Sequence, residues 1–135
     1  MKKNNYPILL IPLLEPRISA GFPSIAEDYG ETQLDLNEFL IKHPAATFYI
    51  RVKGDSMINA GISPDDILIV DRALSATHNK IIIARLHGEF TVKRIMRQGE
   101  KIFLVAANPA YKTIEITADM DFEVWGVVTC IIRQV

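Results

Sequence analysis

Two residues of this chain, Ser56 and Lys93, have side chains that can carry out covalent chemistry together. Ser56 lies in the segment Gly54-Asp55-Ser56-Met57, just after a predicted strand, and Lys93 interrupts an apolar strand predicted downstream. A serine hydroxyl is a weak nucleophile until a base removes its proton, and lysine is such a base only when its amine is neutral. The pair therefore predicts a serine nucleophile served by a lysine base.

A lysine base needs surroundings that lower its pKa by roughly 3 units from its ordinary value of about 10.4. In the segment 89–95, strand alternation places Thr91, Lys93 and Ile95 on one face, where neighbouring side chains can exclude water and favour the neutral amine. Gly54 lets the backbone turn sharply before the serine. We expect the backbone N–H groups of Asp55 and Ser56 to form an oxyanion hole.

Residues 34–135 show the period of a β-rich domain. Phe48, Ile50 and Val52 alternate with polar or amphipathic residues, as in a half-buried strand. Further strands are predicted over residues 67–70, 81–86, 89–95, 102–105 and 122–132, with a tight hairpin turn at His87-Gly88. The fold class we expect is mostly β, a strongly bent antiparallel sheet or partly closed barrel.

Residues 1–33 contain several prolines and glycines and no sustained period, so we expect a flexible, extended N-terminal arm. One short helix should follow, because Asp35 and Glu38 have the spacing of a helix cap. Within the arm, Ala20 and Gly21 form a small-residue peptide bond that the predicted site can cut. The protein is therefore expected to be its own substrate.

Distance along the chain permits this cut in two ways. Thirty-five positions separate Gly21 from Ser56, and an extended chain of that length spans up to roughly 100 Å or more. Cleavage within one chain and cleavage across a dimer are both feasible. Tethering raises the effective concentration of the bond, so a site that is weak on free peptides can still process its own arm.

Composition and charge exclude several other functions. The formal net charge is -1 and the pI is about 6.3, so the broad positive field of proteins that bind the phosphate backbone is missing and we expect no direct nucleic acid binding. The apolar run at residues 6–14 is shorter than the ~20 residues of a membrane span and contains two prolines, so we expect no membrane anchor.

The cysteine and histidine content predicts neither a metal nor a cofactor. Cys130 is the only cysteine, which rules out a disulfide within one chain and suits a reducing cytoplasm. His43, His78 and His87 are scattered singly, without the paired spacing of metal ligands.

Several ordered blocks of this sequence resemble the LexA/UmuD family of self-cleaving serine proteases, peptidase family S24. The resemblance covers Ala20-Gly21-Phe22-Pro23-Ser24, Gly54-Asp55-Ser56-Met57-Ile58, Asp66-Ile67-Leu68-Ile69-Val70-Asp71, Gly88-Glu89-Phe90-Thr91-Val92-Lys93 and Phe122-Glu123-Val124-Trp125-Gly126-Val127-Val128. Only 20 residues precede Gly21, too few for the DNA-binding domain of LexA-type repressors, which favours the UmuD branch. That branch usually carries cysteine where this chain has Ala20, and both residues are small.

The resemblance implies roles and partners. By position, Ser56 would be the nucleophile, Lys93 the general base, and Ala20-Gly21 the scissile bond. Similar proteins are homodimers, are stimulated to cut themselves by a recombinase filament on single-stranded DNA, and then join an error-prone, UmuC-like DNA polymerase subunit in the SOS response to DNA damage. The implied location is cytoplasmic.

Three alternatives remain open from the sequence. The first is a non-catalytic dimeric binding subunit of a DNA polymerase that retains the fold. The second is a serine served by a histidine base, although the three histidines lie in polar turns or at a predicted helix end. The third is a signal-peptidase-like enzyme, which also uses serine and lysine but would need a membrane anchor.

Overall fold

The computed structural model of the chain describes residues 7–16 and 29–135. The chain divides into two units, residues 1–42 and residues 43–135, and each is described by itself. The expected cleavage site at Ala20 and Gly21 lies outside the described residues. The flexible arm over residues 1–33 and the protease domain over residues 34–135 therefore stay predictions.

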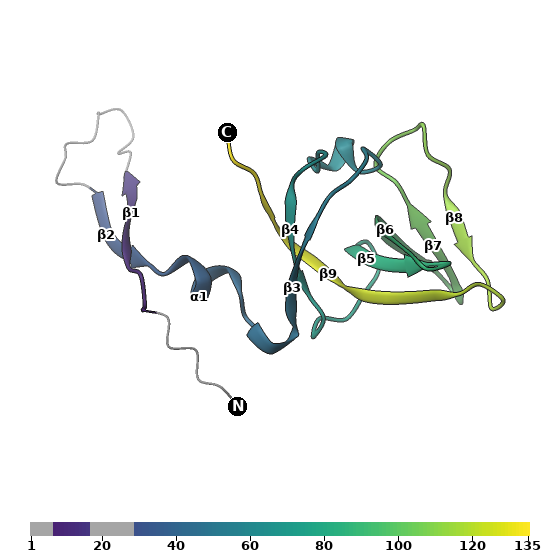
Figure 1. Cartoon of the computed structure of the whole chain (residues 1–135), viewed down its shortest axis with the longest axis horizontal. Helices are drawn as coiled ribbons and strands as arrows, with labels where there is room; N and C mark the ends of the chain where they lie inside the picture. The colour runs from purple at the N-terminus through teal and green to yellow at the C-terminus, as the bar shows by residue number, and fades with distance from the viewer. Residues whose placement is uncertain (1–6, 17–28) are drawn as a thin grey trace. The chain divides into compact units, whose positions relative to one another are not determined.

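The first unit contains a two-stranded antiparallel sheet (Figure 1). Strand β1 (Ile11–Pro16) pairs with β2 (Tyr29–Leu34), with Ile11 opposite Leu34 and Pro16 opposite Tyr29. This pairing was not predicted, because prolines obscure any period of two in β1. Leu14 and its apolar neighbours in β1 are largely exposed, so backbone pairing accounts for this sheet more than apolar burial does.

Helix α1 (Leu36–Leu40) follows β2 and begins as the sequence predicted. Asp35 is its N-cap, and the Asp35 side chain accepts a hydrogen bond from the backbone N–H of Asn37 at 3.1 Å. The helix ends at Ile41, whose N–H donates to the carbonyl of Asn37. Within the described residues, α1 is the only α-helix, and none is long and apolar enough to cross a membrane.

The second unit is built on a seven-stranded antiparallel sheet with the order β3-β4-β9-β5-β6-β7-β8 (Figure 1). Two short 3₁₀ helices, Pro44–Ala46 and Ile58–Ala60, flank β3 and the loop that follows it. The strands are β3 (Thr47–Arg51), β4 (Ile67–Asp71), β5 (Ile81–Leu86), β6 (Glu89–Gln98), β7 (Lys101–Val105), β8 (Ile114–Ile116) and β9 (Phe122–Ile132). The predicted mostly β, antiparallel fold is confirmed. The sheet is open, because β3 and β8 are its two edges and do not pair with each other.

Side chains are buried on both faces of the sheet at β5. Ile82 and Ile83 are neighbours in β5, so their side chains point to opposite faces. Ile83 belongs to one buried cluster with Leu68 and Met57, whereas Ile82 belongs to a second with Ile95. The register of β9 shifts against both β4 and β5, and such bulges increase the local bend and twist of a strand.

In the second unit, the hairpin turn at His87-Gly88 agrees with the sequence-based prediction, whereas one strand, β8, was not predicted. His87 and Gly88 both have positive φ, 50° and 82°, the conformation of a two-residue hairpin turn between β5 and β6. Strand β8 was not predicted, because three residues are too few to show a period. The hairpin formed by β5 and β6 carries Lys93, and the loop after β3 carries Ser56.

Candidate active site

Ser56 lies in a loop that is anchored at both ends. Before it, Val52 is buried, its N–H donates to the carbonyl of Asp66 at 2.8 Å, and its carbonyl accepts from the N–H of Asp65 at 3.0 Å. After it, Met57 is 1% exposed and belongs to the core. Gly54 has a φ of 76°, which lets the chain reverse between these anchors. The half-buried Ser56 is thus held at the rim of the core.

Lys93 lies in the middle of β6, paired with Ile82 of β5, and only 7% of it is exposed. Its Nζ lies 3.1 Å from Ser56 Oγ, 2.6 Å from Thr91 Oγ1 and 3.2 Å from the carbonyl oxygen of Val92. The predicted alternation of Thr91, Lys93 and Ile95 on one face of the strand is present. The structure therefore brings together the two residues singled out in the sequence.

Burial lowers the pKa of Lys93 from the ordinary lysine value. The cause is desolvation of the ammonium, and no carboxylate is among the hydrogen-bond partners of Lys93 in the described part of the chain. A neutral amine has two N–H donors and one lone pair. The Thr91 hydroxyl and the Val92 carbonyl can accept the two donors, which leaves the lone pair for the O–H of Ser56.

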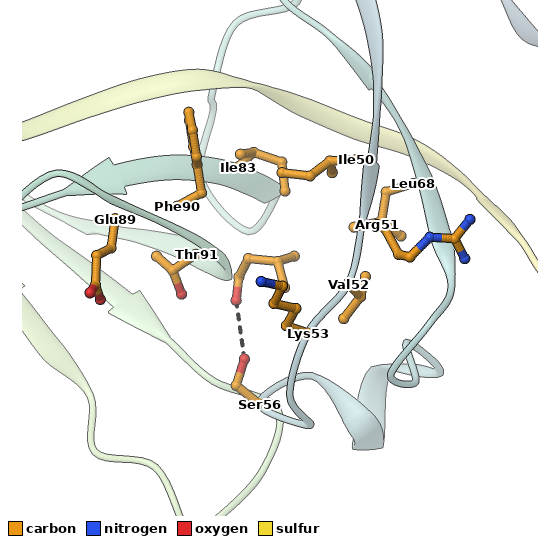
Figure 2. Close-up of a pocket in the computed structure, with 11 residues that line it drawn as sticks. Ile50, Arg51, Val52, Lys53, Ser56, Leu68, Ile83, Glu89, Phe90 and Thr91 are labelled. Atoms are coloured by element: carbon orange, nitrogen blue, oxygen red, sulfur yellow. Dashed lines mark hydrogen bonds between the residues drawn. The ribbon is translucent and has the colours of Figure 1, made fainter.

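Ser56 has a second acceptor within reach. Its hydroxyl donates to the carbonyl oxygen of Val92 at 3.4 Å, the dashed line in Figure 2. While Lys93 is an ammonium and donates to Ser56 Oγ, this carbonyl can accept the hydrogen bond from the Ser56 hydroxyl. When Lys93 is neutral, the same hydroxyl can donate instead to Nζ, which is nearer to Ser56 Oγ than the Val92 carbonyl oxygen is. Loss of one proton from Lys93 thus changes which group accepts from Ser56.

The backbone around Ser56 offers free donors. Within residues 29–135, the N–H groups of Asp55 and Ser56 donate no hydrogen bond. Unpaired N–H groups beside a nucleophile are what an oxyanion hole requires. The predicted role of these two groups stays a prediction.

A pocket of about 430 Å³ lies next to Ser56. Its walls come from the end of β3, from β4 and from the hairpin of β5 and β6. The lining residues are Ile50, Arg51, Val52, Lys53, Ser56, Leu68, Ile83, Glu89, Phe90, Thr91 and Val92. In the view of Figure 2, Ser56 is the lowest and Phe90 the highest of the labelled side chains. The mostly apolar lining is suited to an extended peptide with apolar side chains.

The sequence analysis did not single out Thr91 for a role of its own, although its hydroxyl makes the shortest contact to Lys93 Nζ. The signal was present, because a residue two positions from Lys93 in a strand shares its face.

The histidines lie elsewhere. His43 Nδ1 is 2.6 Å from Asp71 Oδ2, and His78 Nδ1 accepts from the backbone N–H of Arg97. Within the described ranges, no histidine is a hydrogen-bond partner of the Ser56 or Lys93 side chain, and no group of three or more His, Cys, Asp or Glu residues is placed to hold a metal ion.

A β fold in which a turn serine meets a buried lysine defines a candidate serine peptidase of the serine-lysine class. Comparison with known proteins identifies a peptidase family. The sequence pattern of the Peptidase S24-like family matches residues 12–129. The chain therefore belongs to this family, and the LexA/UmuD resemblance of its motifs is confirmed.

Three relatives show how far the similarity extends. The chain is 43% identical over 120 residues to Protein MucA of Escherichia coli, covering 88% of this chain and 82% of that protein. It is 44% identical over 124 residues to Protein ImpA of Shigella flexneri, covering 91% and 83%. It is 36% identical over 119 residues to the LexA repressor of Pseudomonas chlororaphis, covering 87% of this chain and 58% of the repressor. The family implies a self-cleaving serine peptidase.

Proposed function

We propose that Ser56 is the nucleophile and Lys93 the general base of a peptidase that cuts its own arm between Ala20 and Gly21. The observation that carries this proposal is the 3.1 Å contact between Ser56 Oγ and the Nζ of a lysine that is almost completely buried. A solvated lysine is charged near neutral pH and cannot accept a proton, whereas desolvation lowers the pKa of Lys93.

The reaction has two balanced halves. Ser56 Oγ attacks the carbonyl carbon of Ala20 while its proton passes to Lys93 Nζ. The carbon–nitrogen bond then breaks, the nitrogen of Gly21 leaves as an amine that takes the proton from Lys93, and Ala20 is left as an ester on Ser56. Water attacks this ester and gives one proton to Lys93, which returns it to Ser56 Oγ as Ala20 leaves as a carboxylic acid that releases its own proton to solvent.

The free backbone N–H groups of Asp55 and Ser56 support the same proposal. Negative charge develops on the carbonyl oxygen of Ala20 in both halves of the reaction, and two unpaired donors beside the nucleophile can stabilise it. The apolar pocket next to Ser56 is suited to hold the residues around the bond. Because the substrate is part of the chain, weak binding of free peptides is compatible with efficient self-cleavage.

The family relationship supports a further part of the proposal. We propose that the chain acts as a cytoplasmic homodimer, that a recombinase filament on single-stranded DNA stimulates its cleavage, and that the cut protein joins an error-prone, UmuC-like polymerase subunit in the SOS response. Similarity to MucA and ImpA over about nine-tenths of the chain supports this assignment.

The test is self-cleavage of the purified full-length chain. Incubation from pH 7 to pH 10.5, followed by intact mass spectrometry, should give a fragment beginning at Gly21, with a rate that rises with pH as Lys93 becomes neutral. Ser56→Ala should abolish the fragment, whereas Ser75→Ala, a change at an exposed serine, should not. Absence of the Gly21 fragment at every pH, with and without a recombinase filament, would instead support the non-catalytic binding subunit.

A further inference from the structure

The loop that carries Ser56 is held from outside by the turn between β7 and β8. The Asn108 side-chain N–H donates to the backbone carbonyl of Asp55 at 3.0 Å, and the Tyr111 O–H donates to Asp55 Oδ1 at 2.6 Å. One turn therefore binds both the main chain and the side chain of the residue directly before the nucleophile.

The same turn is itself fixed to the far side of the loop. The N–H of Asn59 donates to the carbonyl of Ala107 at 2.9 Å, and the N–H of Ala107 donates to Met57 Sδ at 3.3 Å. Met57 is buried in the core, so these contacts give the turn a rigid base. Because the turn is fixed, a side chain that extends from the turn can hold the neighbouring loop in place.

Tyr111 also borders the proposed base. The centroid of its ring lies 5.7 Å from Lys93 Nζ, near the outer limit at which a ring face attracts an ammonium. Tyr111 is 42% exposed and is therefore not part of the buried core. One residue thus contacts the neighbour of the serine through its hydroxyl and the lysine through its ring.

We propose that Tyr111 is a positioning residue for the Ser56–Lys93 pair, acting through its hydrogen bond to Asp55; this rests on the proposed function. The peptide group between Asp55 and Ser56 carries the N–H expected to face the substrate oxygen. With both the carbonyl and the carboxylate of Asp55 bound, that peptide group and the Ser56 side chain keep one orientation. Small errors in such an orientation are costly in rate.

The hydrogen bond and the proposed base favour compatible protonation states. The bond to Asp55 raises the pKa of Tyr111 and favours the protonated phenol that donates it, whereas burial lowers the pKa of Lys93 and favours the neutral amine. The charged side chains around the pair are Asp55 itself and, along the pocket, Arg51, Lys53 and Glu89. Tyr111→Phe changes none of these charges.

The first experiment measures self-cleavage of Tyr111→Phe against pH. This variant keeps the ring beside Lys93 and removes only the hydroxyl, so we expect a rate lowered roughly tenfold at every pH with an unchanged midpoint. Tyr49→Phe, a matched change at an exposed tyrosine of β3, should cleave like the wild type. A wild-type rate for Tyr111→Phe would overturn the inference, and so would a displaced midpoint without a lower plateau.

A double-mutant cycle tests the route through Asp55. Asp55→Ala and Tyr111→Phe should each slow cleavage, and the double variant should be no slower than the slower single variant, because both remove one interaction. Asp55→Asn retains an acceptor for the phenol and should recover most of the rate. Losses that multiply in the double variant would show that Tyr111 acts by another route and would overturn the proposal.

Two further measurements distinguish a failure of this inference from misfolding of a variant and from a failure of the proposed function. Melting temperatures establish that each variant is folded during the assay, and Asn108→Ala removes the second bond from the same turn if Tyr111→Phe is not folded. If the wild type cleaves and depends on Ser56 while Tyr111→Phe and Asn108→Ala match it, only this inference fails. If the wild type does not cleave at Gly21, the proposed function fails and this inference with it.

Discussion

Two buried ionisable side chains of the second unit, Asp66 and Lys93, have opposite surroundings. Asp66 is 2% exposed and accepts two hydrogen bonds from the Arg133 guanidinium, at 2.7 Å and 2.6 Å, and one from the N–H of Ser63. Lys93 is 7% exposed, and its hydrogen-bond partners within the described residues are all neutral oxygens. Burial alone therefore does not decide whether a group keeps its charge.

The consequence appears in the pKa of each group. Hydrogen bonds from Arg133 and from Ser63 lower the pKa of Asp66 from 3.8 to about 2, against the effect of burial, so the charged form is favoured. Burial lowers the pKa of Lys93, so the neutral form is favoured. The Asp66–Arg133 pair connects the end of β9 to the loop before β4, whereas the burial of Lys93 leaves a reactive amine beside Ser56.

Lys93→Met should have the largest effect and should separate activity from stability. Loss of a general base typically costs 10²- to 10⁴-fold, so we expect cleavage to fall by about that factor. Intact mass spectrometry of the aged protein measures this loss. Lys80→Met, at an exposed lysine, is the matched control and should leave cleavage unchanged.

The stability of Lys93→Met should not fall. A lysine whose pKa is lower in the folded than in the unfolded protein destabilises the folded state at every pH below its unfolded pKa. This cost disappears as the pH rises past the unfolded pKa near 10.5. The variant should therefore melt at or above the wild-type temperature at pH 7 and lose any advantage near pH 11. A variant that melts well below the wild type at pH 7 would contradict the comparison.

Arg133→Met tests the other half of the comparison. It leaves Asp66 buried without its cation, and breaking one partner of a buried pair is strongly destabilising. We expect the melting temperature at pH 7 to fall by at least several degrees while the Ser56–Lys93 contact is kept. Differential scanning calorimetry measures the shift, and Arg72→Met, at an exposed arginine that lies over the Trp125 ring, is a matched control with a smaller expected loss.

The pH dependence of this pair has a definite sign. The folded pKa of Asp66, about 2, lies below its unfolded value of 3.8, so its contribution to stability is present above pH 3.8 and is lost as the pH falls toward 2. Wild-type protein should lose stability across this window. Arg133→Met should show a flatter dependence there, and an unchanged slope would count against the pair as its source.

Thr91→Val should have a smaller effect on activity than Lys93→Met. Valine keeps the shape of threonine and removes the hydroxyl that accepts from Lys93 Nζ at 2.6 Å. Because that acceptor favours the ammonium and also orients the amine, its loss should lower the midpoint of the pH–rate profile and reduce the plateau about tenfold. A profile identical to that of the wild type would show that burial alone prepares Lys93.

His43→Gln should have the smallest effect on the melting temperature. It tests Asp71, a buried carboxylate whose partner is a histidine instead of an arginine. Asp71 is buried, and its burial raises its pKa, but hydrogen bonds from His43 and from the N–H of Ala73 outweigh this and lower it. Since the bond from Ala73 remains in the variant, the melting temperature should fall less than in Arg133→Met. A larger loss would mean that a half-exposed histidine matters more than a bidentate arginine.

The sequence predicted the local parts of this structure well. Alternation placed Lys93 on the same face as Thr91, the cap at Asp35 marked the start of α1, and His87-Gly88 marked the hairpin. Each of these depends on residues a few positions apart. The pairing of β1 with β2 and the presence of β8 escaped prediction because proline content and shortness hide the period.

Contacts between distant segments required the folded chain. Lys93 meets Ser56 across 37 positions and Tyr111 meets Asp55 across 56, and both distances depend on the order of strands in the sheet. By itself the sequence determined which residues are chemically able to act and which strands carry them. The tertiary structure decided that Lys93 is buried beside neutral oxygens while Asp66 receives an arginine, because desolvation and pairing arise only where separate elements pack together.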